Sequence, residues 1–467
     1  MMKIDDKNEK KSVGGVGRRE FLKLSSLTGA SALLAGAGVL AASGPAKAAL
    51  EGVNKKTFSL FRKEHASIDK VHEIAADYKR MDQKNTIFSR GVWSSPISEP
   101  EGLLKSWYAK WLGLVPNPMD GEPGFSPEAH ALMLASWAGE TTGAPLSAGG
   151  VRNKGPLNNW EIHANPTAPK RHKFANKSEA ARIVKRASRY LGADIVGIAP
   201  FDERWVYEKW FDYADVIEGL SEGHVGEPIH EDAVFPFKPK SVISVAFEMD
   251  YDATMTPGYV QDAAAGLEYS HMAETTHKIA TFLNHLGYKA IPCGNDTAMS
   301  IPIALQAGLG EMSRMGTMIS EKYGSRIRLA KVFTDMEIDF DKPITFGVWE
   351  FCKKCKKCAD ACPGQAISVD DEPSMEPNTG SISSHPGVRK WYHNNEKCFG
   401  VWEKNGHCCG VCLAVCPYNK LDTWVHAVAK LAVGVPVGRD FARQMDDAFG
   451  YGEITPQNVE HFWAKED

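Results

Sequence analysis

The sequence predicts an α/β core, in the broad sense that includes α+β arrangements, followed by a small cysteine-rich module. The first observation is an alternation of strand-like and helix-like segments that begins near residue 176. The second is the position of the ten cysteines, since none precedes Cys293 and nine fall between Cys352 and Cys416. With 467 residues, 43% hydrophobic and 24% charged, the chain can bury a substantial core. Its net charge of −4 argues against a nucleic-acid partner.

Residues 1–48 have the pattern of a twin-arginine export signal. Arg18 and Arg19 open the motif RREFLK, a weakly apolar stretch follows, and the cleavage sequence AKA ends at Ala48. The Ser, Thr and Gly content of the stretch argues against a transmembrane anchor. This route carries proteins that have already folded around their cofactors. The mature protein is therefore expected in the periplasm or on the outer face of the cytoplasmic membrane, attached peripherally.

Residues 49–175 are predicted to form an irregular cap or wrapping segment, because Pro, Gly and Trp are scattered along them. The core, residues 176–345, is predicted to begin with a helix. Asn176 with Glu179 resembles a capping box, apolar residues at helical spacing follow, and Gly192 ends the helix.

The rest of the core is expected to alternate between strands and helices. The segments are a strand at 193–200 (ADIVGIAP), a strand at 241–247 (SVISVAF), an amphipathic helix from His271 to Leu286, and a short strand and loop at 289–296. A linker that contains Pro343 then leads to the cysteine module.

The module, residues 346–425, carries the spacing of a bacterial ferredoxin twice, and residues 426–467 form a C-terminal segment. The first run, from Cys352, reads C-x-x-C-x-x-C-x-x-x-C-P. The second is looser, with Cys398 followed at a distance by C-x-x-C-x-x-x-C-P. Thiolates suit iron, and the doubled pattern predicts two [4Fe–4S] clusters, whereas zinc sites lack it.

In the ferredoxin pattern three cysteines of a run hold one cluster, and the fourth, expected at the start of a helix, reaches the other cluster. The expected iron ligands are Cys352, Cys355, Cys358 and Cys416 for cluster one, and Cys398, Cys409, Cys412 and Cys362 for cluster two. Cys408 could compete with its neighbour Cys409, although the spacing favours Cys409. Cys293 is expected to be a plain buried thiol.

The signal, the core and the two-cluster module together resemble the respiratory reductive dehalogenases, and most of all their tetrachloroethene-type members. The resemblance is densest from Ser178 to Asn419, in stretches such as LGADIVGIAPFDERW, EYSHMAE, PCGNDTAMSIPIALQAGLGEMSR and RIRLAKVFTD. It implies a nitroreductase-like core that encloses a corrinoid, followed by a ferredoxin-like module. It also implies removal of chloride from an organohalide, with tetrachloroethene or trichloroethene favoured, in anaerobic organohalide respiration.

The resemblance also implies three catalytic residues. Tyr269 falls on the proton-donating tyrosine of the family's Y-S-x-M-A-E stretch, Asn295 on the asparagine of C-G-N-D, and Arg328 on the pocket arginine. A free tyrosine has a pKa near ~10, so it is protonated at neutral pH and able to donate, and a neighbouring guanidinium would stabilise the phenolate left behind. From the residues alone, Tyr269 is expected near the start of an amphipathic helix. Trp402, within the second cysteine run, is a candidate for the substrate-pocket wall.

A lower axial histidine for the corrinoid is not expected, because the motif D-x-H-x-x-G is absent and the nearest string, residues 222–226, has the wrong acid and spacing. The corrinoid is therefore expected to be base-off. No G-x-G-x-x-G or P-loop opens a helix, so nicotinamide chemistry lacks support. Expected partners are a small organohalide, a membrane-anchor protein and a respiratory electron donor, with a homodimer left open.

Two other functions stay open. Epoxyqueuosine reductase shares the corrinoid and two-cluster plan but acts on tRNA, which calls for a basic face and a cytoplasmic address. A two-cluster electron-transfer protein without catalysis would leave the long region before the module unexplained.

Overall fold

The computed structural model describes residues 62–94, 103–143, 170–212, 229–295, 297–421, 442–444, 446–448 and 450–465. These residues belong to one compact unit that runs from Leu60 to Asp467. The predicted export signal at 1–48 and the string at 222–226 lie outside the described residues.

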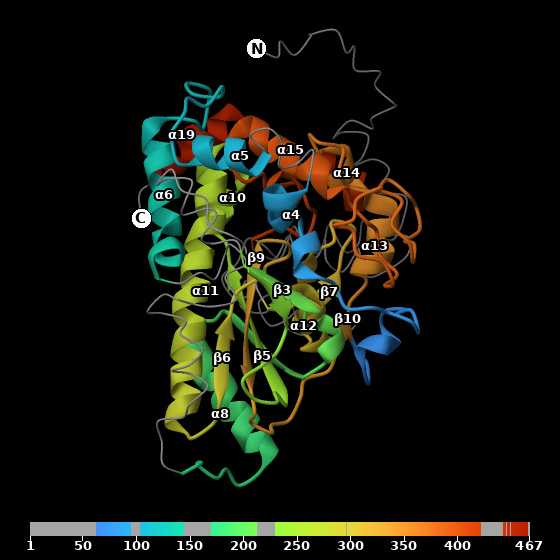
Figure 1. Cartoon of the computed structure of the whole chain (residues 1–467). Helices are drawn as coiled ribbons and strands as arrows, with labels where there is room; N and C mark the ends of the chain where they lie inside the picture. The colour runs from blue at the N-terminus through green and yellow to red at the C-terminus, as the bar shows by residue number, and fades with distance from the viewer. Residues whose placement is uncertain are drawn as a thin grey trace, which may run out of the picture. The chain divides into compact units, whose positions relative to one another are not determined.

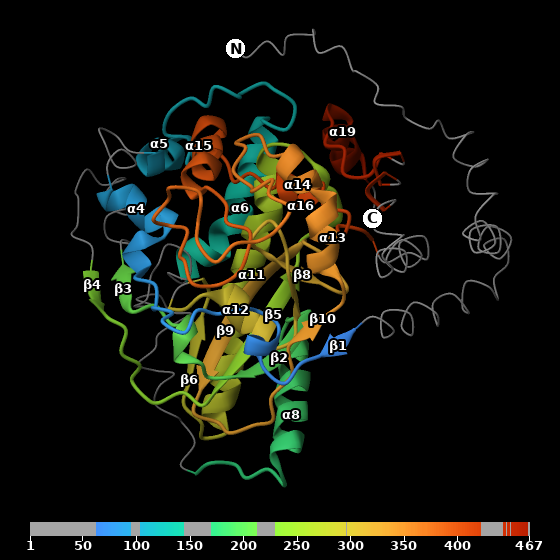
Figure 2. The same cartoon turned by 90° about the vertical axis from the view of Figure 1, so that its right-hand side faces the viewer.

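A four-stranded sheet with the order β2-β5-β9-β6 forms the centre of the molecule (Figure 1 and Figure 2). The strands are β2 (Ile195–Pro200), β5 (Ser241–Glu248), β9 (Ile327–Thr334) and β6 (Ala290–Cys293). All three neighbouring pairs are antiparallel. The core is therefore the α+β form of the predicted class, and the three predicted strands are confirmed.

Helices cover both faces of this sheet. One face packs against α8 (Lys177–Tyr190) and α11 (Tyr259–His285), and the other packs against α12 (Ser300–Gln306). Side chains alternate along each strand, as the pleat requires. In β9, for example, Ala330 and Val332 join the core on the α11 side, whereas Leu329 and Phe333 join the core on the α12 side.

The predicted first helix is confirmed as α8. The side chain of Asn176 accepts the backbone N–H of Glu179 at 2.8 Å. The carboxylate of Glu179 accepts the N–H of Ala175 at 2.8 Å rather than that of Asn176, so the capping box is only half formed. Gly192, with φ of 128°, follows the helix in a conformation that disfavours a side chain.

The predicted start of the second core helix was wrong, because α11 begins at Tyr259 rather than at His271 and is 27 residues long. Its first half is buried on nearly all sides, so it lacks the one-sided apolar stripe that marks a surface helix. Gly258, with φ of 78°, precedes the first turn. Tyr269 therefore lies inside the helix and not near its start.

The described parts of the segment before the core, 62–94, 103–143 and 170–175, are not irregular throughout, which corrects a second expectation. It contains α4 (Ile87–Trp93), α5 (Leu103–Trp111) and α6 (Pro127–Gly143). Helix α6 lies alongside α11 in both views (Figure 1 and Figure 2), and Ser270 donates a hydrogen bond to the carbonyl of Ser136 at 2.6 Å. Because α6 has no clear amphipathic stripe, its sequence pattern did not indicate a helix.

The remaining regular elements are short. They are β1 (Lys63–Glu64) paired with β10 (Ile344–Thr345), β3 (Lys209–Asp212) paired with β4 (Ile229–Asp232), β7 (Gly310–Met312) paired with β8 (Met318–Ser320), the 3-10 helices η1 (Ile68–Lys70), η2 (Gln83–Asn85) and η3 (Glu203–Trp205), and the helices α10 (Tyr251–Met255) and α19 (Pro456–Ala464).

The cysteine module follows the core, and its described part, up to residue 421, contains four helices. They are α13 (Val348–Cys355), α14 (Lys357–Asp360), α15 (Asn395–Asn405) and α16 (Val411–Ala414). The linker before them is fixed to the sheet, because the carboxylate of Asp341 accepts the N–H of Ile198 at 2.8 Å.

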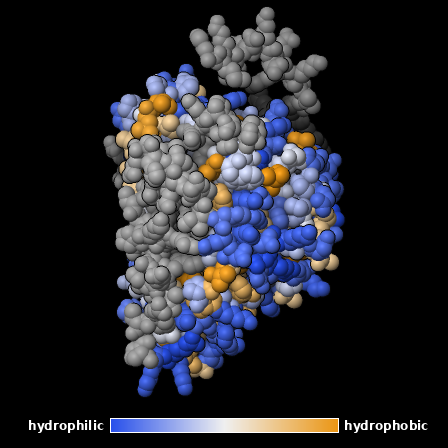
Figure 3. All heavy atoms as spheres, in the orientation of Figure 1, coloured by the Kyte–Doolittle hydropathy of each residue, from blue (hydrophilic) through white to orange (hydrophobic). Residues whose placement is uncertain are grey.

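Hydrophobic side chains on the face shown in Figure 3 form small separate groups among hydrophilic ones. Of the helices within the described ranges, none is both long and apolar enough to cross a membrane.

Candidate active site

The structure places Tyr269, Asn295 and Arg328 together, although they come from three different elements. Arg328, Ala330 and Val332 are alternate residues of β9, so their side chains lie on the same face of the sheet, the face that α11 covers. Tyr269 lies on α11, and Asn295 follows directly after β6, the strand that pairs with β9. The sheet register therefore brings the arginine and the asparagine to the same tyrosine.

The phenol of Tyr269 has a hydrogen-bond donor on its oxygen and a cation near its ring. The amide nitrogen of Asn295 donates to the Tyr269 oxygen, and the guanidinium carbon of Arg328 lies 5.7 Å from the ring centroid. Tyr269 and Arg328 are half-buried, whereas Asn295 is exposed. The Nε of Arg328 is buried and has no hydrogen-bond partner among the described residues. This donor is available to a bound group.

Lys331 holds the loop that carries Asn295, and the sequence did not reveal this role. Its side chain is 0% exposed, and its ammonium donates to the carbonyl of Gly294 and to the hydroxyl of Ser300, the latter at 3.0 Å. Lysine is costly to bury without such partners. A lysine in the middle of the otherwise apolar run LAKVF of this strand was the signal that could have indicated this role.

Trp137 packs against the ring of Tyr269. The two rings are stacked, with centroids 4.8 Å apart and planes 25° apart. The indole lies against Gly266 of α11, where an added Cβ would come within 2.3 Å of it. Glycine at this position lets α6 approach α11 closely enough for the stack to form.

Asp262 joins this arrangement to the cysteine module. Its side chain is 0% exposed and accepts the indole N–H of Trp137 at 3.0 Å, the indole N–H of Trp111 at 3.2 Å and the backbone N–H of Cys408 at 2.8 Å. Burial raises the pKa of Asp262, and these hydrogen bonds oppose that shift. The sequence signal that could have indicated this role of Asp262 was a single acidic residue in the run of small residues DAAAG.

Trp402 lies in an aromatic group rather than beside Tyr269. Its ring centroid is 5.7 Å from that of Phe88, 6.0 Å from that of Trp107 and 6.0 Å from that of Phe399. Further ring contacts run from Trp107 through Trp111 and Trp137 to Tyr269. Trp402 is thus connected to the site through other aromatic rings, and its role as a pocket wall stays a prediction.

Four thiols surround one cavity in the cysteine module. None of the ten cysteines forms a disulfide, and Cys352, Cys355, Cys358 and Cys416 line the same cavity, which has about 300 Å³ of empty space and is partly open to solvent. This is the set that the ferredoxin spacing assigns to cluster one. Burial raises the pKa of the Cys355 thiol to about 12. Bound iron would therefore have to displace the thiol proton, as thiolate ligation requires.

The other four predicted ligands form a second group. Cys412 interacts electrostatically with Cys409, Cys398 and Cys362, and also with Cys416 of the first group. Cys408 has a different set of neighbours, because its strongest interactions are with Asp262 and Arg328, and that with Cys409 is weaker. Cys409 interacts with Cys362, so the ligand assignment that the spacing favours is consistent with these contacts.

The fourth cysteine of each run does not begin a helix, which corrects the expectation. Cys362 follows α14 and Cys416 follows α16. Each precedes a proline, Pro363 or Pro417, and a residue before proline is disfavoured in the helical conformation. The helices therefore end before these cysteines. The backbone N–H of Ala366 donates a hydrogen bond to the Cys362 sulfur at 3.3 Å.

The helix that carries Cys352 and Cys355 is fixed at its N-terminus by Glu311. The Glu311 carboxylate accepts three backbone N–H groups between Phe346 and Trp349, at 2.6, 3.1 and 2.9 Å. Burial raises the pKa of Glu311, and the same hydrogen bonds oppose the shift. A negative charge at a helix N-terminus is also favoured by the helix dipole.

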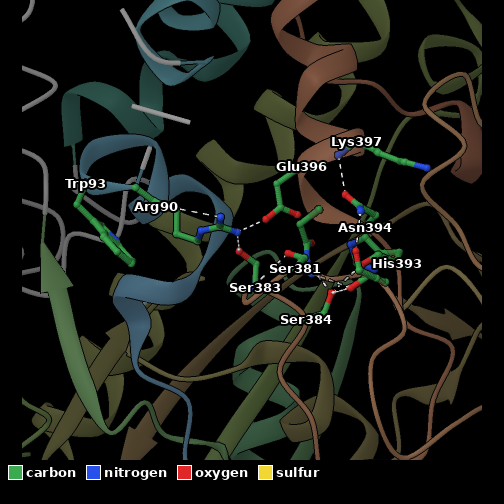
Figure 4. Close-up of polar contacts among 12 residues, drawn as sticks. Arg90, Trp93, Ser381, Ser383, Ser384, His393, Asn394, Glu396 and Lys397 are labelled. Carbon is green, nitrogen blue, oxygen red and sulfur yellow. Dashed lines mark hydrogen bonds and ion pairs between the residues drawn. The ribbon is translucent and has the colours of Figure 1, made fainter. Parts of the chain in front are cut away.

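The helix that carries Cys398 is fixed by Arg90 of α4 (Figure 4). The Arg90 guanidinium, 8% exposed, forms an ion pair with Glu396 and donates to the hydroxyl of Ser383 at 3.1 Å. Asn394 caps the same helix by accepting the N–H of Lys397 at 2.9 Å. The N-terminal segment therefore helps to position the second group of thiols.

A larger cavity adjoins Asn295. It has about 980 Å³ of empty space, open to solvent, and its lining includes Tyr78, Trp205, Met299 and His385. Three buried polar atoms of its lining residues lack hydrogen-bond partners in the described part of the chain. They are Nε2 of His72, the hydroxyl of Tyr78 and Nε1 of Trp205. Buried polar groups are rarely left unpaired, so they indicate a site for a polar-edged ligand.

Comparison with known proteins identifies relatives of the cysteine module and of most of the chain. Residues 351–419 match the family model of a 4Fe-4S double cluster binding domain. The chain is 38% identical over 416 residues to a tetrachloroethene reductive dehalogenase of Desulfitobacterium hafniense, covering 78% of this chain and 75% of that protein. It is 42% identical over 342 residues to the tetrachloroethene reductive dehalogenase of Dehalobacter restrictus, covering 68% of this chain and 62% of that protein.

Solved structures show the same fold. A reductive dehalogenase structure described as suggesting a mechanism for B12-dependent dehalogenation matches with a TM-score of 0.62 at 22% identity. The match covers 86% of this chain and 50% of that chain, so this chain spans about half the length of that structure.

Proposed function

This chain belongs to the reductive dehalogenases, a family of oxidoreductases that act on carbon–halogen bonds, and from that membership we propose that it replaces a halogen of an organohalide by hydrogen. The reaction consumes two electrons and one proton and releases halide. Chloroethenes are the favoured substrates, since both relatives described above are named for tetrachloroethene. Anaerobic organohalide respiration is the proposed physiological setting.

The observation that carries this proposal is the convergence of Asn295 and Arg328 on Tyr269. The Tyr269 oxygen accepts a hydrogen bond from Asn295, so in that contact the phenol is the acceptor, and its O–H is the proton that would be delivered to the substrate carbon. As the carbon–halogen bond breaks, the halide leaves with the bonding pair. The two electrons that the reaction consumes supply the pair for the new carbon–hydrogen bond, and the phenol supplies its proton. The guanidinium of Arg328 then stabilises the phenolate, which is reprotonated from solvent before the next turnover.

The cofactors proposed for this site are a base-off corrinoid and two [4Fe–4S] clusters. When bound, the corrinoid would supply a reducing cobalt, and the clusters would pass it electrons one at a time. The eight thiols suit two clusters, and the unpaired polar atoms of His72, Tyr78 and Trp205 suit a large ring with polar edges. A nitroreductase-like arrangement of the core around the corrinoid is part of the same proposal, and a structure of the holoenzyme would test it.

The expected composition of the purified mature protein is about eight iron and one cobalt per chain, as two clusters and one corrinoid require. Supplied with a low-potential one-electron donor, it should release chloride from tetrachloroethene or trichloroethene, with chlorinated alkanes and phenols tested alongside. Metal analysis and halide release measure this. Protein that carries its clusters but no cobalt, and releases no halide, would favour the two-cluster electron carrier. Activity on epoxyqueuosine-containing tRNA instead of organohalides would favour that rival enzyme.

The proposed location is outside the cytoplasm, by export through the twin-arginine route, with a membrane-anchor protein as partner. Replacing Arg18 and Arg19 together by lysine is expected to leave an unprocessed precursor in the cytoplasm, because this pathway reads the arginine pair. Fractionation and N-terminal sequencing would measure it. Normal processing after Ala48 in the double variant would contradict the assignment.

A further inference from the structure

Arg314 is a buried cation beside cluster one. It follows β7, its side chain is 1% exposed, and it lines the cavity that Cys352, Cys355, Cys358 and Cys416 surround. A guanidinium stays charged at any pH that a folded protein tolerates. The chain therefore holds a fixed positive charge at the wall of this cavity.

Every described hydrogen-bond partner of this guanidinium is a neutral backbone carbonyl. Nε and Nη2 donate to the carbonyl of Cys352 at 3.0 and 2.8 Å, and Nη1 donates to the carbonyls of Ser368 and Asp370 at 2.8 and 2.7 Å. Its guanidinium carbon also lies 4.6 Å from the ring centroid of Trp391. These contacts fix the fork in place without an ion pair. The carboxylate of Asp371 acts on it electrostatically, but that side chain is 82% exposed and is paired with Lys356.

Other cations near cluster one have acidic partners, and Arg314 differs from them. Arg443 pairs with Asp360 at 2.6 Å, and Lys420 pairs with Asp446 at 2.6 Å. Within the described ranges Arg314 forms no ion pair, and a buried charge without a counter-charge is costly. Four thiolates around a [4Fe–4S] cluster carry a net negative charge that would compensate it.

We propose that Arg314 is the counter-charge of cluster one and raises its reduction potential. Reduction adds one electron to the cluster and transfers no proton, so the cluster becomes more negative. A fixed cation in a buried, low-dielectric setting stabilises this reduced form more than the oxidised form. The proposal rests on the double-cluster domain and not on the organic substrate, so it can fail while the proposed dehalogenation stands.

The test is a redox titration of the full-length holoenzyme with dithionite as reductant. Electron paramagnetic resonance monitors the fraction of each cluster that is reduced. In Arg314→Gln, the equilibrium constant for reduction of one cluster should fall by about tenfold or more, which is about 59 mV for a one-electron couple. The potential of the other cluster should stay unchanged. Arg314→Lys keeps the charge and should stay within about threefold of the wild type.

Arg443→Gln provides the matched control. Arg443 also donates to a ligand carbonyl, that of Cys355, but its side chain is 33% exposed and paired with Asp360. Its removal should change the reduction equilibrium by at most about twofold, because solvent and the acid already screen it.

Two outcomes would overturn the proposal. One is an Arg314→Gln protein with full iron content and both cluster potentials unchanged. The other concerns the lysine variant, which decides the question if Arg314→Gln loses its cluster-one iron. A lysine variant with full iron and a near-normal potential supports the role of the charge. A lysine variant that loses the cluster, or shifts by tenfold, shows that the planar fork and its hydrogen bonds are what matter.

Discussion

Tyr269→Phe is expected to lower the rate of halide release by roughly 10²-fold or more, the usual contribution of a positioned general acid. Phenylalanine keeps the ring that stacks on Trp137 and faces Arg328, and it removes only the hydroxyl that Asn295 contacts. Packing around α11 should therefore be preserved. Steady-state halide release, with iron and cobalt content measured on the same samples, tests the prediction.

A matched control is Tyr190→Phe, which removes the hydroxyl of an exposed tyrosine at the end of α8. That variant should release halide at the wild-type rate. If Tyr269→Phe retained full cofactor content and near-normal turnover, this tyrosine would not be the proton donor. The acid would then be a pocket water or another side chain, and the family assignment would stand.

Cys409→Ser is expected to remove cluster two and abolish turnover, because the electron path to the active site would be broken. Iron should fall from about eight to about four per chain, the content of one remaining cluster. Iron analysis together with electron paramagnetic resonance of the reduced protein measures the loss.

The neighbouring cysteine supplies the control for this prediction. Cys408 is 9% exposed and interacts most strongly with Asp262, and less strongly with its neighbour Cys409, so Cys408→Ser should keep both clusters. Loss of a cluster in Cys408→Ser, with retention in Cys409→Ser, would reverse the ligand assignment at this position.

Features that depend on residues close together in the sequence could be predicted from the sequence. The cysteine spacing indicated a two-cluster module, and residues 351–419 match a double-cluster family model. The resemblance to reductive dehalogenases is confirmed by relatives of 38% and 42% identity. Helix α8 was also predicted, because its cap residue and apolar stripe lie within one short segment. The roles assigned to Tyr269, Asn295, Arg328 and Trp402 stay predictions.

Two helices without a one-sided apolar pattern could not be placed in this way. The first half of α11 is buried on nearly all sides, whereas α6 carries alanines on its exposed face, at Ala131, Ala135 and Ala138, as well as at the buried Ala129. Periodicity reports a contrast between an apolar and a polar face, and neither segment has that contrast. The cap segment was therefore predicted to be irregular, and α11 was predicted to begin too late.

The sequence by itself determined the family, the two-cluster module and three of the four core strands, because motif spacing and strand patterns are local properties of the chain. Only the tertiary structure decided that β9 joins the sheet, how Asp262 and Trp137 support Tyr269, that Cys408 contacts Asp262, and that Arg314 donates to backbone carbonyls such as that of Cys352. The physical reason is that a buried polar or charged group must be satisfied by whatever the fold brings to it. In this chain those partners come from segments far apart in the sequence.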